Sequence, residues 1–586
     1  TTTTGYKVFR GTSSTTATTQ IGTSGVNGYT DLTALNGTTY YYTVKASNST
    51  VDSVASSVVS AAPSLTSTVA AMPTPTPSAP AAITPWTCPA ASLVKTGMGA
   101  IKDLGITHLE LLPVYDFGSV NEANPTFNWG YDPQNPNVPE GSYSSDATNP
   151  SARITELKQG VQAIHSNGMR VVMDVIYNHV MNPNTFSQES LVPGYFFRTD
   201  AQGNLTNQSG CGNDVASERP MVRKYIVDSV VYWAKQYHID GFRFDIMSLV
   251  DKVTMSQVVT ELKKIDPTII VFGEGWSYDE VKAQLPYSMQ SRQANAGNTE
   301  LQSIGFFNDQ MRDGIKGDTG NDILPGYVNG LASNYINQVI NGIFGQTATN
   351  FNADKANSRS WTATTPGQSV NYVEVHDGLT LWDKLKAANT FGVTDATLQK
   401  QGRQAASLVL LSQGMPFLHA GQEFLRSKGG NSNSYAPPDS ATTTQAKLDW
   451  ELKTNSLKWN TAFTNKMNVD YYRGLIALRK AHPLFRMNSV AEINKRFEWL
   501  AGYGTNALGF MYKNTASDST KLGDTWNRIA VGVNPNDTAL TMTLPTGTWY
   551  VVVNDTAAGV STLATITTNK VTVPANSTVV LTDTKP

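Results

Sequence analysis

The sequence predicts an α/β protein whose central part forms a mostly parallel sheet, with an all-β segment on either side of it. Two observations carry this prediction. Between residues 93 and 486, apolar strand-like runs alternate with amphipathic helical segments, which is the pattern of a parallel sheet covered by helices. Residues 1–60 and 487–586 instead hold short strand-like runs bounded by Gly, Pro, Asn or Asp.

The first segment, residues 1–60, reads as an all-β module. Its segment from Leu35 to Tyr40, LNGTTY, resembles the tyrosine corner of fibronectin type III domains, so Tyr40, Tyr42 and Val44 are expected to point inward. The strands that should precede GYKVFR have no counterpart, which predicts a partial module. Residues 61–92 are rich in Pro, Thr, Ala and Ser and are expected to form an extended linker.

The central segment, residues 93–486, contains seven strand candidates. They are 107–114, 170–178, 239–246, 269–276, 303–309, 370–377 and 415–423. Helices are predicted over 151–167 and 220–236, where apolar residues recur at helical spacing. The inward positions of these two helices are Ile154, Leu157, Val161 and Ile164 in the first and Val222, Ile226, Val230 and Trp233 in the second. Residues 487–586 predict a closing β-sandwich without helices.

Composition limits the possible partners. The 586 residues include only 15% charged residues, and 44 basic against 46 acidic residues give a formal charge of -2. Such a balance disfavours nucleic acid and anionic membranes, whose binding depends on many Lys and Arg contacts. The sequence contains no run of about 18 apolar residues, the length that a membrane-spanning helix needs. The two cysteines, Cys88 and Cys211, can pair once at most and form no zinc cluster.

Polar residues end several strands of the predicted sheet. They are Asp174, His179, Arg243, Asp245, Glu274, His376 and Asp377. In (β/α)₈ enzymes the carboxyl ends of the strands build the active site, so these groups should converge. A single Asp at a strand end is more often a helix N-cap, but repetition over several strands favours a functional site.

Carboxylates gathered without a metal cluster fit glycoside hydrolysis. One carboxylate attacks the anomeric carbon and a second, protonated one donates to the leaving oxygen. A nearby Arg stabilises the ionised nucleophile, while burial and like charge raise the pKa of the donor. The aromatic residues Trp129, Tyr131 and Trp276 are candidates for stacking on sugar rings.

Four ordered motifs identify a family. DVIYNH (174–179), DGFRFD (240–245), GEGW (273–276) and VEVHD (373–377) resemble the signature regions of the α-amylase superfamily of glycoside hydrolases. More narrowly, FNWGYDP (127–133), PEGSYS (139–144), SGCGND (209–214), ERPMVRKYIVDS (218–229) and FLHAGQEFLRSK (417–428) resemble type I pullulanases. The resemblance runs from about residue 94 to the C-terminus.

The resemblance implies a debranching hydrolase that cleaves α-1,6 bonds in pullulan and branched α-glucans with retention of configuration. It implies Asp245 as nucleophile, Glu274 as acid/base and Asp377 as the carboxylate that holds the distorted sugar. The implied substrate-binding residues are Tyr131, His179, Arg243, Trp276 and His376, with Asp174 as structural support. No cofactor or catalytic metal is implied. Calcium binding, known in parts of the superfamily, stays open, although no EF-hand-like loop is present.

Three departures from the family pattern bear on the fold and the site. The Pro-rich linker stands where the first barrel strand is expected, so the resemblance predicts a (β/α)₈ barrel without that strand. Gly378 replaces a common Asn, and residues 433–450 carry Ala436 and extra residues.

Two alternative functions stay open. They are an amylopullulanase that also cleaves α-1,4 bonds, and an inactive starch-binding remnant. A secreted or cell-surface location is expected, although the sequence begins without a signal peptide.

Overall fold

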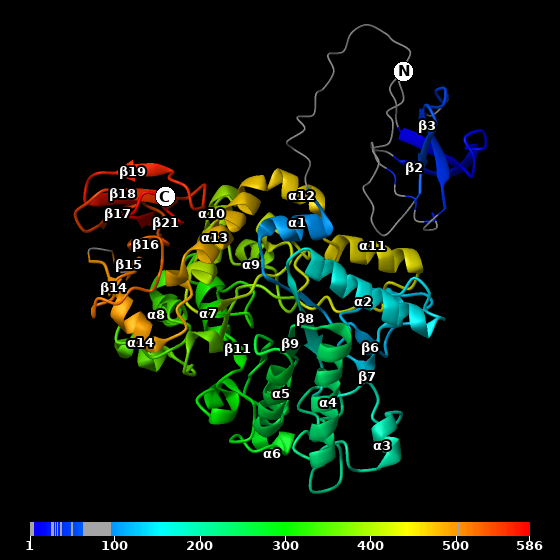
Figure 1. The fold of residues 1–586 in the computed structure, drawn as a ribbon, viewed down its shortest axis with the longest axis horizontal. Coiled ribbons are helices and arrows are strands. Elements are labelled where there is room, and N and C mark those ends of the chain that lie inside the picture. Colours follow the sequence, from blue (N-terminus) through cyan, green and yellow to red (C-terminus); the bar gives the residue numbers. More distant parts are fainter. Residues whose placement is uncertain are drawn as a thin grey trace. The chain divides into compact units, whose positions relative to one another are not determined.

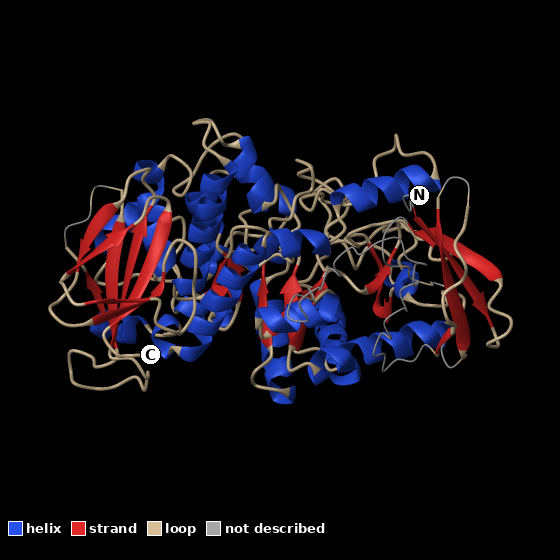
Figure 2. Ribbon diagram, turned by 90° about the horizontal axis from the view of Figure 1, so that it is seen from above, coloured by secondary structure: helices blue, strands red, loops and turns tan. Residues whose placement is uncertain are grey.

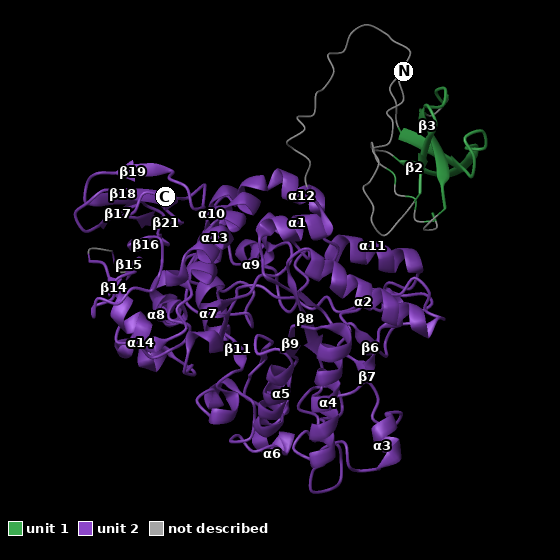
Figure 3. Cartoon of the chain, viewed as in Figure 1, with its two compact units in different colours: residues 1–93 green, residues 94–586 purple. Residues whose placement is uncertain are grey.

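The computed structural model describes residues 5–24, 29, 31, 33–34, 38–48, 51–62, 95–501, 504 and 506–586 (Figure 1). The chain divides into two compact units, Thr1–Leu93 and Val94–Pro586 (Figure 3). Among the described residues, no helix has both the length and the apolar character that crossing a bilayer requires.

The first unit contains an antiparallel sheet of four strands in the order β2-β1-β3-β4. The strands are β1 (Gly5–Gly11), β2 (Thr19–Ser24), β3 (Tyr40–Ser47) and β4 (Val59–Ala61). Tyr40 and Val44 are buried as predicted, whereas Tyr42 is only half-buried because its hydroxyl reaches out to donate to Asp31 (2.9 Å). The fibronectin type III likeness stays a prediction, since residues 35–37 of the tyrosine corner and linker residues 63–92 lie outside the described residues.

The second unit is built around a parallel sheet of seven strands, one for each strand candidate of the central segment. Its order, β13-β12-β11-β10-β9-β8-β5, follows the chain, so each strand pairs with its neighbours in sequence. The strands are β5 (His108–Leu111), β8 (Arg170–Val175), β9 (Gly241–Phe244), β10 (Ile270–Gly273), β11 (Gly305–Phe307), β12 (Ser369–Asn371) and β13 (Met415–Pro416). In Figure 2 the strands are red, and blue helices surround the strands of this central sheet.

Within the described residues, β5 and β13 form the two ends of this sheet. Every residue of these two strands is half-buried, whereas the inner strand β9 is completely buried. The predicted lack of a first strand concerns residues 82–93, which lie outside the described residues, so it stays a prediction.

The alternation of side chains along β8 and β9 defines two faces of the sheet. Val171, Met173 and Val175 pack in one cluster with the apolar stripe of helix α4 (Pro220–Tyr237), while Val172 lies in a separate cluster on the other face. On β9, Phe242 and Phe244 belong to the helix-facing cluster. The residue between them, Arg243, therefore faces the inside of the sheet.

The two predicted helices are present, with one correction. Helix α4 buries its stripe as predicted, and α2 (Pro150–Ser166) buries Val161 and Ile164. Ile154 is expected inside, but it is 39% exposed, because α2 buries its stripe only in its second half, at Val161 and Ile164. Gly168 follows the helix with φ 78°, as expected for a helix end.

The remaining helices and a small ribbon surround the sheet. The ribbon strands are β6 (Tyr115–Phe117) and β7 (Pro133–Pro139). The helices are α1 (Gly97–Leu104), α3 (Ser187–Leu191), α5 (Lys252–Ile265), α6 (Glu280–Ala283), α7 (Asp309–Lys316), α8 (Ala332–Ile343), α9 (Leu381–Ala387), α10 (Asp395–Leu411), α11 (Thr444–Thr454), α12 (Trp459–Thr464) and α13 (Lys466–Ala481).

The C-terminal part begins with helix α14 (Val490–Arg496), which corrects the expectation of strands alone after residue 487. Ser489 caps this helix by accepting from the Glu492 N–H, a local signal of the kind that starts helices. A six-stranded sheet, β14-β15-β16-β21-β18-β19, and the pair β17-β20 follow. They are β14 (Phe497–Trp499), β15 (Leu508–Lys513), β16 (Arg528–Asn534), β17 (Leu540–Thr543), β18 (Trp549–Val553), β19 (Ala564–Ile566), β20 (Lys570–Val573) and β21 (Ser577–Thr582).

This C-terminal sheet shares one hydrophobic core with the helices beside it (Figure 1). Leu408 of α10 and Leu475 of α13 belong to the same buried cluster as Val531 and Val580. A buried glutamine of α10, Gln404, also donates to two backbone carbonyls of the C-terminal part, each at 2.9 Å. The two parts are therefore packed as one compact unit.

Candidate active site

The polar residues at the strand ends converge on the inner face of the parallel sheet. Asp174 lies two residues after Val172 on β8, and Glu274 lies two residues after Phe272 of β10. Val172 and Phe272 both belong to the inner cluster, so the period of two carries the carboxylates to the same side. Asp245 follows the end of β9 and is tied to β8 by its N–H, which donates to the Val175 carbonyl (2.9 Å).

Arg243 holds three carboxylates together. Its Nη1 lies 3.0 Å from both Asp174 Oδ1 and Asp245 Oδ1, and its Nη2 lies 2.8 Å from Glu274 Oε1. The side chain of Arg243 is 3% exposed, so these contacts are made away from water. Asp245 and Glu274 thus share one guanidinium, which brings the two carboxylates close together in a site of low dielectric.

Asp245 is fixed from a second side by Asn178. The Asn178 Nδ2 donates to Asp245 Oδ2 (2.9 Å) and to the Asp245 carbonyl (2.7 Å), and the asparagine is completely buried. His179 Nδ1 lies 2.5 Å from Asn178 Oδ1, and its Nε2 lies 2.8 Å from the Tyr131 carbonyl. Both oxygens of the Asp245 carboxylate therefore have a donor, which fixes its orientation.

Asp174 lies deepest in the group. The Tyr131 hydroxyl donates to Asp174 Oδ2 (2.5 Å), while Arg243 holds the other oxygen. Burial raises the pKa of Asp174 to about 7, against the lowering effect of Arg243. With no exposed surface, Asp174 supports its two neighbours and offers no oxygen to solvent.

Glu274 combines the contacts and the environment of a proton donor. The backbone N–H of Ile246 donates to its Oε2 (3.0 Å), and Arg243 contacts its Oε1. Burial raises the pKa of Glu274 to about 8, because the loss of hydration outweighs the attraction of Arg243 and because Asp245 and Asp377 lie nearby. The direction of this shift favours the protonated form that a proton donor needs.

Of the predicted sugar-binding residues, Arg243 and His179 are buried among these carboxylates, whereas Tyr131 and His376 lie at the rim of the group. The rings of Tyr131 and His376 are stacked with centroids 5.0 Å apart. Asp377 lies 3.5 Å from His376 Nε2 and is 56% exposed, so its carboxylate is available to a ligand. Trp129, expected to stack on a sugar, is 5% exposed and instead packs its ring against His376 at 4.7 Å.

A cleft of about 280 Å³ opens beside Glu274 and Asp377. Trp276 lies in its wall, together with residues from α7 and from the segment after β12. Trp276 is thus placed next to Glu274, on a wall that does not include Tyr131, Asp174 or Asp245.

Sequence reasoning missed two residues that support the rim and the nucleophile candidate. One is Asn178, which lies inside the motif DVIYNH and donates to Asp245. Its amide side chain close to the end of a buried strand is a signal that could have identified it. The other is Lys428, whose Nζ donates to the His376 carbonyl (2.6 Å) and lies 5.6 Å from the Trp129 ring centroid. Lys428 ends the motif FLHAGQEFLRSK, but no local pattern shows that this residue meets His376, which lies 52 positions earlier.

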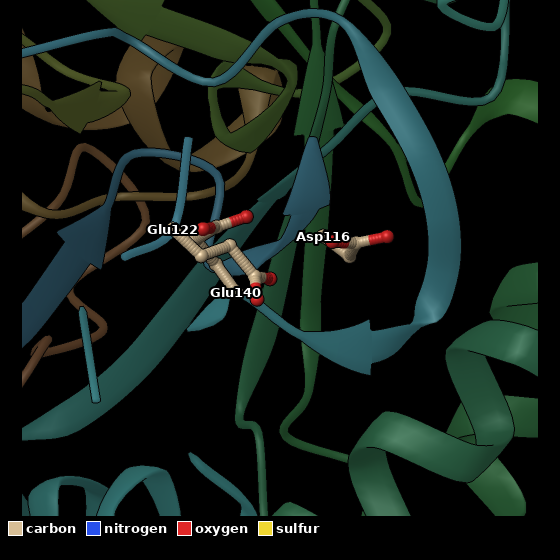
Figure 4. A group of neighbouring side chains, drawn as sticks. All are labelled: Asp116, Glu122 and Glu140. Carbon is tan, nitrogen blue, oxygen red and sulfur yellow. The ribbon is translucent and has the colours of Figure 1, made fainter. Parts of the chain in front are cut away.

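A group of three carboxylates elsewhere bears on the calcium expectation. Asp116, Glu122 and Glu140 lie near one another (Figure 4). Each already has partners: Asn135 donates to Asp116, Arg153 pairs with Glu122 (2.5 Å), and backbone N–H groups donate to Glu140. The positive charge of Arg153 opposes a cation here, so the group is better described as an ion-pair network.

Comparisons with known proteins agree with this geometry. The family described as alpha amylase, catalytic domain, matches residues 199–470, and the family of alpha-1,6-glucosidases, pullulanase-type, C-terminal, matches residues 445–584. A pullulanase of Bacillus subtilis is 42% identical over 412 residues, covering 69% of this chain and 53% of that protein. Pullulanase A of Streptococcus pneumoniae is 30% identical over 70% of this chain and 34% of its own length.

Solved structures give the same result. The crystal structure of pullulanase from Paenibacillus barengoltzii in complex with maltohexaose and α-cyclodextrin is similar with a TM-score of 0.74 and 33% identity, covering 99% of this chain and 92% of that chain. A pullulanase from an Anoxybacillus species has a TM-score of 0.73 and 36% identity over 83% of this chain and 64% of its own.

The barrel-type parallel sheet, with its carboxylates gathered at one edge, defines a glycoside hydrolase fold of the α-amylase type. The chain belongs to the pullulanase family. It spans about half the length of the Bacillus subtilis relative and about a third of the Streptococcus pneumoniae one.

Proposed function

We propose that this chain hydrolyses α-1,6-glucosidic bonds of pullulan and branched α-glucans with retention of configuration. The observation that carries the proposal is the shared contact of Asp245 and Glu274 with Arg243, together with the raised pKa of Glu274. A retaining enzyme needs one ionised and one protonated carboxyl close to the same bond. Here the guanidinium and Asn178 donate to the Asp245 carboxylate and hold it in place, while burial raises the pKa of Glu274 and favours its protonated form.

In the first step, the Asp245 carboxylate attacks the anomeric carbon as Glu274 donates its proton to the glycosidic oxygen. The bond to the leaving sugar breaks, and a glycosyl ester forms on Asp245. Glu274, now ionised, takes a proton from water, which attacks the same carbon and releases the sugar with the original configuration. Asp377, exposed on the rim, holds hydroxyls of the reacting ring beside His376.

The other contacts of the reacting ring are assigned by position. Tyr131 stacks beneath the sugar, and His376 binds its hydroxyls. His179, which the resemblance also assigns to the sugar, has both ring nitrogens beside protein oxygens and is better placed to hold Asn178 and Tyr131. Burial lowers the pKa of both histidines, so each is a neutral hydrogen-bonding group at neutral pH. Asp174 acts as support through Tyr131 and Arg243. The proposal needs no metal or cofactor, and a calcium ion in a structural role would leave activity sensitive to chelators.

The choice of the α-1,6 bond rests on relatives. The family that matches the C-terminal part is one of alpha-1,6-glucosidases of pullulanase type, and the named relatives are pullulanases. Complexes of the Paenibacillus barengoltzii enzyme hold maltohexaose and maltotetraose, so α-glucans are the substrate class to test first. A secreted or cell-surface location fits a polymeric substrate, and fractionation of expressing cells with an antibody to the chain checks it.

The decisive variant is Asp245→Asn. It should abolish the release of reducing ends from pullulan while the melting temperature stays within a few degrees of the parent, because the amide keeps the shape but not the charge. Full activity in this variant would remove Asp245 from the nucleophile role. Glu189→Gln, on the outer helix α3, is a matched carboxyl-to-amide control that should leave activity unchanged.

Two rival functions have separate signatures. Maltotriose as the product of pullulan requires α-1,6 cleavage, whereas the degradation of linear amylose requires α-1,4 cleavage and would indicate an amylopullulanase. A cooperative thermal transition without any activity on either polymer would support an inactive starch-binding remnant.

A further inference from the structure

Lys316 is a buried lysine that the proposed mechanism does not use. It is the last residue of helix α7 and is 2% exposed. Among the described residues its side-chain amine has no hydrogen-bond or ion-pair partner, and the charges around it act only through space. Its amine nitrogen is not sealed from solvent, so it can meet a ligand in the cleft that this residue lines.

Lys316 lines the same cleft as Glu274, Trp276 and Asp377. The other cation of the cleft, Arg312, is already engaged: it makes two contacts with Asp313, at 2.7 and 2.8 Å, and donates to the Tyr372 hydroxyl (2.8 Å). Lys316 is therefore the cation in this wall, within the described part of the chain, that is left to meet a ligand, and it shares the wall with the indole of Trp276.

The place of the cleft indicates which part of a substrate enters it. Glu274 and Asp377 line it, so the cleft begins at the reacting ring, whereas Tyr131 and Asp245 do not, so it extends away from the side where they hold that ring. A general acid stands between the reacting ring and the leaving group, because it protonates the oxygen that joins them. The cleft on the other side of Glu274 is thus the space for the departing chain.

Lys316 is suited to a neutral partner. Burial and the charge of Arg312 lower the pKa of Lys316 to about 7, in spite of Asp313 and Glu374 nearby, and Lys384 acts in the same direction as Arg312. The amine is therefore partly uncharged at neutral pH and does not demand a carboxylate. A sugar hydroxyl, which both accepts and donates, satisfies the amine in either form.

We propose that Lys316 is a specificity-determining residue of the leaving-group subsite, where its amine binds a hydroxyl of the α-glucan chain that departs from Glu274. This inference rests on the proposed function, since it assumes that Glu274 protonates the glycosidic bond.

The test compares two substrates that differ in their leaving group. Pullulan places a glucan chain in the cleft, whereas α-maltotriosyl fluoride has only a fluoride ion to release and leaves the cleft empty. Lys316→Met removes the donor but keeps the length of the side chain. We expect kcat/KM on pullulan to fall roughly 5- to 30-fold, as for the loss of one buried hydrogen bond, and kcat/KM on the fluoride to change less than about twofold.

Two further variants protect the test. Lys316→Gln keeps a donor in the cleft and should retain more activity on pullulan than Lys316→Met, even if the methionine variant folds poorly. Lys252→Met, on α5 and paired with Glu300, is the matched control and should leave both substrates unaffected.

The outcomes are distinct. An equal loss on both substrates would overturn the proposal, because it would show that Lys316 acts through the carboxylates or the fold. No loss on pullulan would also overturn it. If the unchanged protein releases no reducing ends from pullulan, the proposed function itself fails, whereas an active parent with an unaffected Lys316→Met variant refutes the subsite alone.

Discussion

Replacing Arg243 with Met tests whether charge, and not packing, holds the carboxylates together. The guanidinium contacts Asp174, Asp245 and Glu274 within 2.8 to 3.0 Å and is almost completely buried. Removing one partner of a buried ion pair typically costs about 3 to 5 kcal/mol, because the remaining charge is left without compensation. We expect a loss of this size in the free energy of unfolding at pH 8.

The loss should depend on pH in a defined direction. The folded-state pKa of Asp174 is about 7, above its ordinary value of 3.8, so the folded protein takes up a proton as pH falls. A carboxyl whose pKa is raised by folding lowers the free energy of unfolding as the pH rises from about 4, where the unfolded chain loses the proton, to the folded-state pKa. Without Arg243 this pKa rises further, so the cost at pH 8 increases while at pH 5 the protonated carboxyl carries no charge.

The measurement is thermal or denaturant unfolding of parent and variant at pH 5 and pH 8. We expect the difference between them to shrink to about 1 to 2 kcal/mol at pH 5, the part that comes from lost packing and hydrogen bonds. Arg198→Met is the control: this buried arginine pairs with Glu218, which is 33% exposed and hydrated, so its loss should vary little with pH. A loss at Arg243 that is equal at both pH values would refute the reasoning.

Three other predictions concern Glu274, Gln404 and Gly168. Hydrolysis of pullulan should decline above about pH 8, roughly tenfold per pH unit, as Glu274 loses its proton, and a pH profile of kcat/KM with no such decline would contradict its role as acid. Gln404→Ala should lower the unfolding free energy by roughly 2 to 4 kcal/mol, because two buried carbonyls of the C-terminal part lose their donor. Gly168→Ala, at φ 78° in open space, should cost about 1 kcal/mol in thermal unfolding, whereas Gly160→Ala within α2 should stabilise slightly.

The strand positions and the candidate catalytic residues were predictable because they depend on local patterns. Each of the seven strands of the parallel sheet shows in the sequence as an apolar run, and Asp174, Arg243 and Glu274 stand where those runs meet polar residues. A period of two then decides which side each residue faces. Where local signals compete, prediction failed: α14 was missed, since its seven residues carry a weak apolar pattern beside strand-like neighbours.

The sequence by itself determined the parallel sheet, its polar strand ends and the motifs of the pullulanase family. Only the tertiary structure decided which groups touch: that Arg243 reaches three carboxylates, that Trp129 is buried behind His376, and that Lys428 supports the rim. Lys316 became visible only as part of the wall of a cleft. The physical reason is separation along the chain. Strand register and loop packing bring together residues tens to hundreds of positions apart, and no local pattern records which of them meet.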